Sequence, residues 1–96
     1  MGHHARAMTD RSSLQPDPEA ALLAAYARGE PEAARALAAA LVPRSLAQAR
    51  RMLADAAEAE DVVQEAMLRL WRAAPGWREG EARVSTWLYR VVANLC

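Results

Sequence analysis

Apolar residues recur every three to four positions along most of the chain, a period that predicts helices. The clearest helix runs from Asp55 to Ala74. Asp55 can accept hydrogen bonds from first-turn N–H groups while Glu58 reaches back, as in a capping box. Pro75-Gly76 then ends the helix. The face expected to pack against a core consists of Val62, Val63, Ala66, Met67, Leu70, Trp71 and Ala74.

The opposite face of this helix is polar, and Leu68 stands in its middle. A single exposed leucine is common on protein surfaces and needs no function. Alternatively, Leu68 is the apolar centre of a contact patch for a partner with a basic rim. The pattern alone leaves both interpretations open. Leu68 is flanked by Asp61, Gln64, Glu65 and Arg72, and Arg69 also belongs to the polar face.

Two helix starts precede this segment. Asp17-Pro18-Glu19 supplies a cap, a proline in the first turn and a carboxylate that favours the helix dipole, and Gly29 ends that helix. Glu30-Pro31-Glu32 begins a longer, alanine-rich helix. Because Pro43 lies inside it, we expect a kink or a break between Leu41 and Pro43.

The last periodic segment follows a loop from Pro75 to Arg83. Ser85 is predicted to cap a helix from Thr86 onward. Because the period continues to Cys96 without a stop signal, we expect the chain to end inside this helix, with Cys96 on the core side. The core side also contains Val84, Leu88, Val91, Val92 and Leu95, whereas Thr86, Tyr89, Arg90 and Asn94 face outward with Trp87 at the boundary.

Trp77 lies in the loop, where two interpretations are possible. Its ring can fold back over the edge of the core. It can instead offer a stacking surface for bases beside Arg78 and Arg83.

Composition supports a small all-α domain, an antiparallel bundle of about four helices over residues 17–96. The chain has 96 residues and no phenylalanine. Its net charge of zero argues against a uniformly basic DNA-binding surface. The charges are segregated, because residues 55–65 contain five acids and no base, and residues 66–96 contain five arginines and two acids. We interpret residues 1–16, which show no period, as a disordered arm or tag remnant.

One cysteine, no long apolar segment and no leader pattern favour a reducing cytoplasm without membrane insertion. Glu58, Asp61 and Glu65 share one side of a helix, but no histidine accompanies them, so we expect no metal and no other cofactor. The sequence also has no glycine-rich phosphate loop and no nucleophile paired with a base, so we do not expect an enzyme.

Two segments resemble region 2 of bacterial RNA polymerase sigma factors of the sigma-70 type, in the extracytoplasmic-function (ECF) group. The first, residues 57–71, reads AEAEDVVQEAMLRLW, and the second, residues 82–96, reads ARVSTWLYRVVANLC. The helices before them fit the family more loosely. The resemblance implies a helical domain that is truncated within its last helix and that acts in transcription initiation.

The resemblance also implies two contact surfaces. The first would dock on the clamp coiled coil of core RNA polymerase, through Asp61, Gln64, Glu65, Leu68 and Arg72. The second would hold the non-template strand of the promoter's minus-ten element, through Trp77, Arg78, Glu79, Arg83, Thr86, Trp87, Arg90 and Asn94. A different class of function stays open. The chain could be a helical module that binds only protein, held by an anti-sigma factor or acting as a decoy for the clamp.

Overall fold

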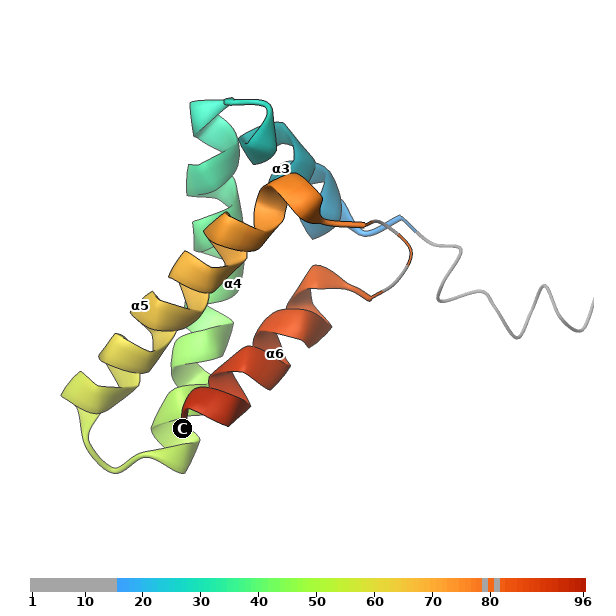
Figure 1. Ribbon diagram of the computed structural model, residues 1–96. Helices are drawn as coiled ribbons and strands as arrows, with labels where there is room; N and C mark the ends of the chain where they lie inside the picture. The colour runs from blue at the N-terminus through green and yellow to red at the C-terminus, as the bar shows by residue number, and fades with distance from the viewer. Residues whose placement is uncertain (1–15, 79, 81) are drawn as a thin grey trace, which may run out of the picture.

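The computed structural model describes residues 16–78, 80 and 82–96, and these form four helices (Figure 1). No strand occurs among them, so the predicted all-α fold is confirmed. The predicted arm, residues 1–16, lies outside the described residues except for its last position. The elements are α3 (Pro18–Ala27), α4 (Pro31–Met52), α5 (Ala56–Ala73), the 3-10 turn η1 (Ala74–Gly76) and α6 (Val84–Leu95).

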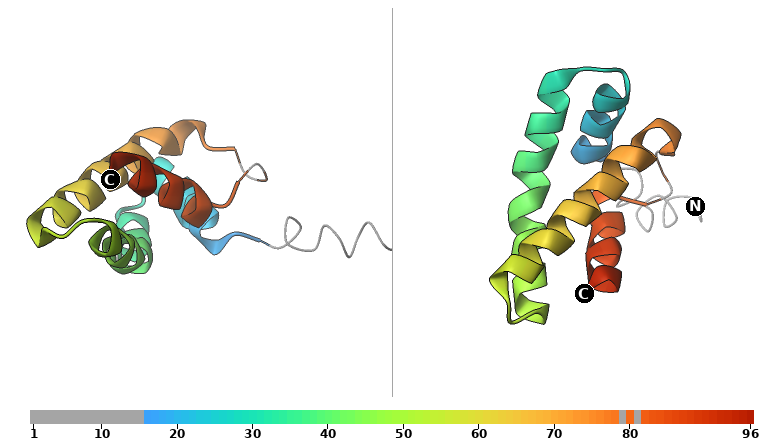
Figure 2. Two further views of the ribbon diagram at one scale, coloured as in Figure 1. Left: turned by 90° about the horizontal axis from the view of Figure 1, so that it is seen from below. Right: turned by 60° about the vertical axis from the view of Figure 1, so that its left-hand side comes forward.

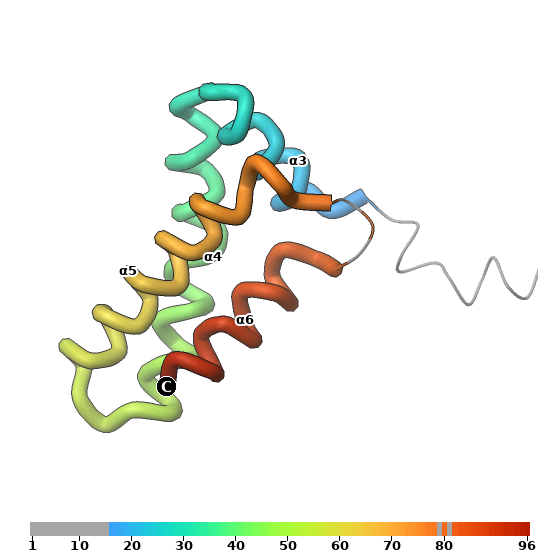
Figure 3. Tube along the Cα trace, viewed as in Figure 1, coloured from blue at the N-terminus to red at the C-terminus, as the bar shows by residue number. Residues whose placement is uncertain are grey.

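Successive helices run antiparallel, as the Cα trace shows (Figure 3). The long α4 packs against the other three helices, and α5 and α6 also pack against each other. Two further views show α3 at the end of the bundle where α4 begins (Figure 2). Because α5 and α6 pack on α4 and on each other, their outer faces belong to one packed body.

The core is built from aliphatic side chains of all four helices. The predicted apolar face of α5 is confirmed, because Val63, Ala66, Met67 and Leu70 are buried. Burial of this kind contributes about 1.5–3 kcal/mol for each large aliphatic side chain. The largest fully buried side chains are Leu23, Leu37, Leu41, Leu70, Val84, Leu88 and Val92.

Side-chain caps at the starts of α3 and α5 form as predicted. Asp17 Oδ1 accepts a hydrogen bond from the Glu19 N–H at 3.1 Å. Asp55 Oδ1 accepts from the N–H groups of Ala57 and Glu58 at 2.7 and 3.2 Å. The second half of the predicted capping box is wrong, because the Glu58 carboxylate accepts no hydrogen bond within the described part of the chain.

Pro43 does not break α4, which is continuous from Pro31 to Met52. The proline ring is exposed, while Leu41 and Ser45 on either side of it are buried. Packing of the flanking turns therefore maintains the helix around the missing N–H donor, which tertiary contacts can offset.

The start of α6 differs from the prediction. The helix begins at Val84, one residue before Ser85, so Ser85 lies in the first turn and is not the cap. The capping acceptor is Asp17, whose Oδ2 accepts the Val84 N–H at 2.9 Å. Cys96 is exposed, not core-facing, because it lies one residue beyond the end of α6.

Candidate functional site

The outer face of α5 carries the first group of predicted site residues together. We call Asp61, Gln64, Glu65, Leu68 and Arg72 the acidic face. Leu68 is 46% exposed, which agrees with its predicted position on the polar side of the helix. Asp61, Gln64 and Arg72 are also exposed, and Glu65 is half-buried. An accessible apolar group thus lies among polar side chains on one rigid helix.

Arg69 modifies the charge of this face in a way that the sequence pattern did not single out. Arg69 Nε donates to Glu65 Oε2 at 3.1 Å, one helical turn away. The Glu65 carboxylate is therefore partly neutralised. Asp61 has no ion-pair or hydrogen-bond partner among the described side chains. The uncompensated negative charge is consequently concentrated toward the N-terminal half of α5.

A mostly apolar groove of about 380 Å³ lies between α4 and α5, beside the acidic face. Small side chains on α4 leave this space open, since Ala38 stands opposite the larger residues of α5. The groove could not be predicted from the sequence, because it depends on how the two helices cross. Its lining consists of Ala38, Val42, Val63, Gln64, Met67, Leu68 and Trp71.

The predicted nucleic-acid residues gather on α6 and the loop before it. We call Trp77, Arg78, Thr86, Trp87, Arg90 and Asn94 the indole face. Thr86, Arg90 and Asn94 are exposed and Trp87 is half-buried, which agrees with the predicted orientation of α6. Glu79, also predicted here, lies outside the described residues.

Trp77 folds back over the edge of the core, the first of the two interpretations of its position in the loop. The side chain packs partly buried against the core cluster, and its ring makes an edge-on contact with Trp87, with centroids 5.6 Å apart and planes at 87°. Its indole Nε1 is buried without a hydrogen-bond acceptor in the part of the chain that is described. An unmade hydrogen bond at a buried donor costs about 1–3 kcal/mol.

The two indoles border a pocket of about 220 Å³. It lies where η1 and the following loop meet the start of α6. Its walls combine flat aromatic surface with a guanidinium, a chemistry suited to planar, anionic groups. The lining residues are Ala73, Gly76, Trp77, Arg78, Ala82 and Trp87.

Arg83, also predicted to contact the strand, is exposed but forms an ion pair with Asp17. Its Nη2 lies 3.7 Å from Asp17 Oδ1, and the Asp17 side chain is only 10% exposed. Asp17 thus contacts the first turns of both α3 and α6 and the last loop residue. From the sequence, Asp17 could be assigned only as the cap of α3, because α6 lies far along the chain.

Across residues 16–78, 80 and 82–96, no three histidine, cysteine or carboxylate side chains come close enough together to hold a metal ion. Within the same residues, no helix combines the length and apolar character needed to cross a membrane.

Comparison with known proteins gives the identification. Residues 37–96, well over half of the chain, match the family Sigma-70 region 2. The chain belongs to this family. The region includes α5 and α6, which carry the acidic and indole faces, and the family consists of transcription initiation factors, not enzymes.

The matched relatives are bacterial sigma factors, one of them of the ECF group. The ECF RNA polymerase sigma factor SigG of Mycobacterium tuberculosis (strain H37Rv) is 43% identical over 51 residues, which cover 53% of this chain and 14% of SigG. The RNA polymerase sigma-H factor of Pseudomonas aeruginosa (strain PAO1) is 46% identical over 44 residues, 46% of this chain and 22% of that protein. The chain therefore spans a minor part of each relative's length. No solved structure matches it.

Proposed function

We propose that this region 2 domain docks on the clamp coiled coil of bacterial core RNA polymerase and holds the non-template strand of the promoter's minus-ten element. It would do so in the bacterial cytoplasm, as part of a sigma factor. The observation that supports this most directly is the presence of two unlike outer surfaces on adjacent helices of one body. One surface surrounds Leu68 with acids, and the other combines Trp87 with Arg90 and Asn94.

Docking on the clamp would use the acidic face in two ways. Asp61 and Glu65 would attract a basic rim and orient the approach, a role in which charges change association rates most. Leu68 would lose its exposed surface at the centre of the contact, where desolvated apolar anchors contribute most of the binding energy. The groove between α4 and α5 adds apolar surface beside Leu68 for a side chain of the partner.

Strand capture would use the indole face. A base that leaves the stack costs a few kcal/mol, and stacking on an aromatic ring returns about 1–3 kcal/mol. Trp87 offers such a ring at the edge of the neighbouring pocket. Arg90, which has no ion-pair partner among the described residues, would contact phosphate.

Leu68→Asp tests the docking surface. Because Leu68 faces outward, the variant should fold with an unchanged circular dichroism spectrum but lose retention of core polymerase in a pull-down. Met52→Asp is the matched control, since Met52 is a similarly exposed apolar residue, 51% exposed, outside the acidic face. If Leu68→Asp retains core polymerase as well as Met52→Asp does, the docking assignment is wrong.

A second candidate function is a helical module that binds only protein, such as an anti-sigma factor or, as a decoy, the clamp. The observation in its favour is the pairing of Arg83 with Asp17, which withdraws one predicted phosphate contact from the indole face. A single-stranded oligonucleotide with a minus-ten-like sequence separates the two candidates. Strand capture predicts binding that weakens with salt and quenches tryptophan fluorescence, whereas a protein-only module predicts neither effect.

A further inference from the structure

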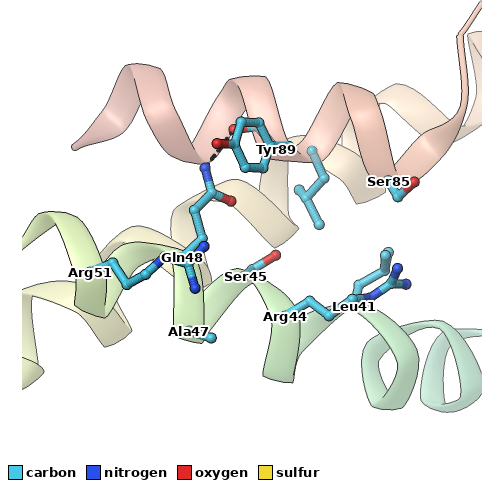
Figure 4. Close-up of a pocket in the computed structure, with 9 residues that line it drawn as sticks. Leu41, Arg44, Ser45, Ala47, Gln48, Arg51, Ser85 and Tyr89 are labelled. Atoms are coloured by element: carbon cyan, nitrogen blue, oxygen red, sulfur yellow. Dashed lines mark hydrogen bonds between the residues drawn. The ribbon is translucent and has the colours of Figure 1, made fainter.

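A second groove, on the other flank of α6, belongs to neither of the surfaces described above. It has a volume of about 350 Å³ and lies between α4 and α6 (Figure 4). Ser85 and Tyr89 each stand two positions from Trp87, which places them about 160° around the helix from it. The groove is lined by Leu41, Arg44, Ser45, Ala47, Gln48, Arg51, Ser85, Leu88 and Tyr89.

The polar chemistry of this groove favours an anion. The lining includes two arginines and three hydroxyl groups, those of Ser45, Ser85 and Tyr89, and Ser45 is buried. No lining residue carries a carboxylate. Arg44 is already engaged, because it pairs with Glu19 and donates to the Ala40 carbonyl at 3.1 Å. Arg51 has no ion-pair or hydrogen-bond partner among the described residues, so it supplies the uncompensated positive charge.

The groove is held in a fixed geometry. Gln48 is 4% exposed, and its Nε2 donates to the Tyr89 backbone carbonyl at 2.9 Å, a bond that joins α4 to α6 (Figure 4). The Tyr89 side chain itself is free to contact a ligand, since the residue is 58% exposed. An exposed ring and an unpaired guanidinium that line the same groove form a combination suited to nucleotides, through stacking and charge.

We propose that this groove binds a backbone phosphate of the strand that α6 holds, with Arg51 contacting the phosphate and Tyr89 the adjoining sugar or base. The inference rests on the proposed function and extends the strand-binding surface from the indole face around α6 to this groove. Continuity of the surface favours a strand over an isolated anion. Thr86 lies one turn from Tyr89, and Arg90 follows Tyr89 directly, so exposed polar residues connect the indole face with the groove.

Arg51→Ala and Arg50→Ala form a matched pair that tests this site. Both variants remove one arginine from the last turn of α4, but Arg50 is exposed and does not line the groove. The measurement is the affinity for a fluorescent single-stranded minus-ten oligonucleotide across a series of salt concentrations. The affinity falls as salt rises, and loss of one phosphate contact should make the slope of log affinity against log salt shallower by about 0.7 for a single strand.

We expect this reduction for Arg51→Ala and no reduction for Arg50→Ala, with both variants folded by circular dichroism. Equal slopes for the two variants, while the parent binds the oligonucleotide, would overturn the groove assignment and leave the proposed function standing. Failure of the parent to bind any single strand would overturn both.

A free anion is the competing occupant, and a thermal melt distinguishes it from the strand. Inorganic phosphate is added at constant ionic strength to the parent and to Arg51→Ala. For a strand site we expect no rise in the melting temperature of the parent at millimolar phosphate. A rise that Arg51→Ala abolishes would show a site for isolated phosphate and overturn the assignment to a strand.

Discussion

The Asp17 carboxylate accepts a hydrogen bond from the backbone N–H of Val84 at 2.9 Å, although the two residues are 67 positions apart. Its other oxygen accepts the Glu19 N–H at 3.1 Å. One largely buried side chain therefore caps the first turns of α3 and α6 together. This arrangement fixes the point at which the loop with Trp77 enters the helix with Trp87.

Asp17→Ala should destabilise the domain through both caps. Loss of one cap typically costs about 0.5–2 kcal/mol, so we expect a total of roughly 1–4 kcal/mol in urea unfolding. Asp17→Asn should lose less, because asparagine is also a good cap but retains only one acceptor oxygen. A free energy of unfolding for Asp17→Ala equal to that of the parent would contradict the double-cap role.

Leu70→Ala and Leu68→Ala should separate the two faces of α5. Leu70 is fully buried, so its truncation leaves a cavity and should lower the free energy of unfolding by about 2–5 kcal/mol. Leu68 lies on the surface, and its truncation should change stability by about 0.5 kcal/mol or less. Comparable losses at the two positions, measured by thermal melting, would show that the orientation of α5 is wrong.

Arg69→Ala should strengthen docking on core polymerase, provided that the acidic face is the docking surface. The substitution frees the Glu65 carboxylate from its ion pair and makes the field of the face more negative. We expect a faster association rate at low salt and little difference at high salt, where screening removes the effect. Arg35→Ala is the control, because Arg35 pairs with Glu32 on a different helix. The same rate increase in both variants would indicate a general charge effect.

Trp87→Ala should weaken binding of a minus-ten single strand by about 5- to 150-fold, which corresponds to roughly 1–3 kcal/mol of stacking. Trp87→Phe keeps a smaller ring and should lose less. Because Trp87 also contacts the Trp77 ring, the melting temperatures of both variants must be measured beside the affinities. Unchanged binding by a folded Trp87→Ala would rule out stacking at this position.

The local features of the fold follow from short stretches of sequence. Asp17 and Asp55 act on N–H groups two or three residues away, so their capping of α3 and α5 could be predicted from adjacent residues alone. The faces of α5 and α6 follow from the helical period, which also predicted the exposure of Leu68 and Arg90. The family match agrees with the resemblance seen in the same segments.

Features that join distant segments could not be predicted in this way. The cap of α6 was assigned to Ser85 because that residue is near in sequence, whereas the acceptor comes from Asp17 in another helix. Pro43, where a kink or a break was expected, does not break the helix, because buried neighbours on both sides maintain α4. The edge-on contact of Trp77 with Trp87 also depends on a loop returning to the bundle.

Short-range signals suffice to place the helices and to orient their faces, because capping and amphipathic period act within a few residues. What lies between the helices follows from their packing: the two grooves on α4 and the bond from Gln48 to the Tyr89 carbonyl. Spaces and contacts of that kind depend on how helices cross and on side chains far apart in the chain. No local pattern encodes them.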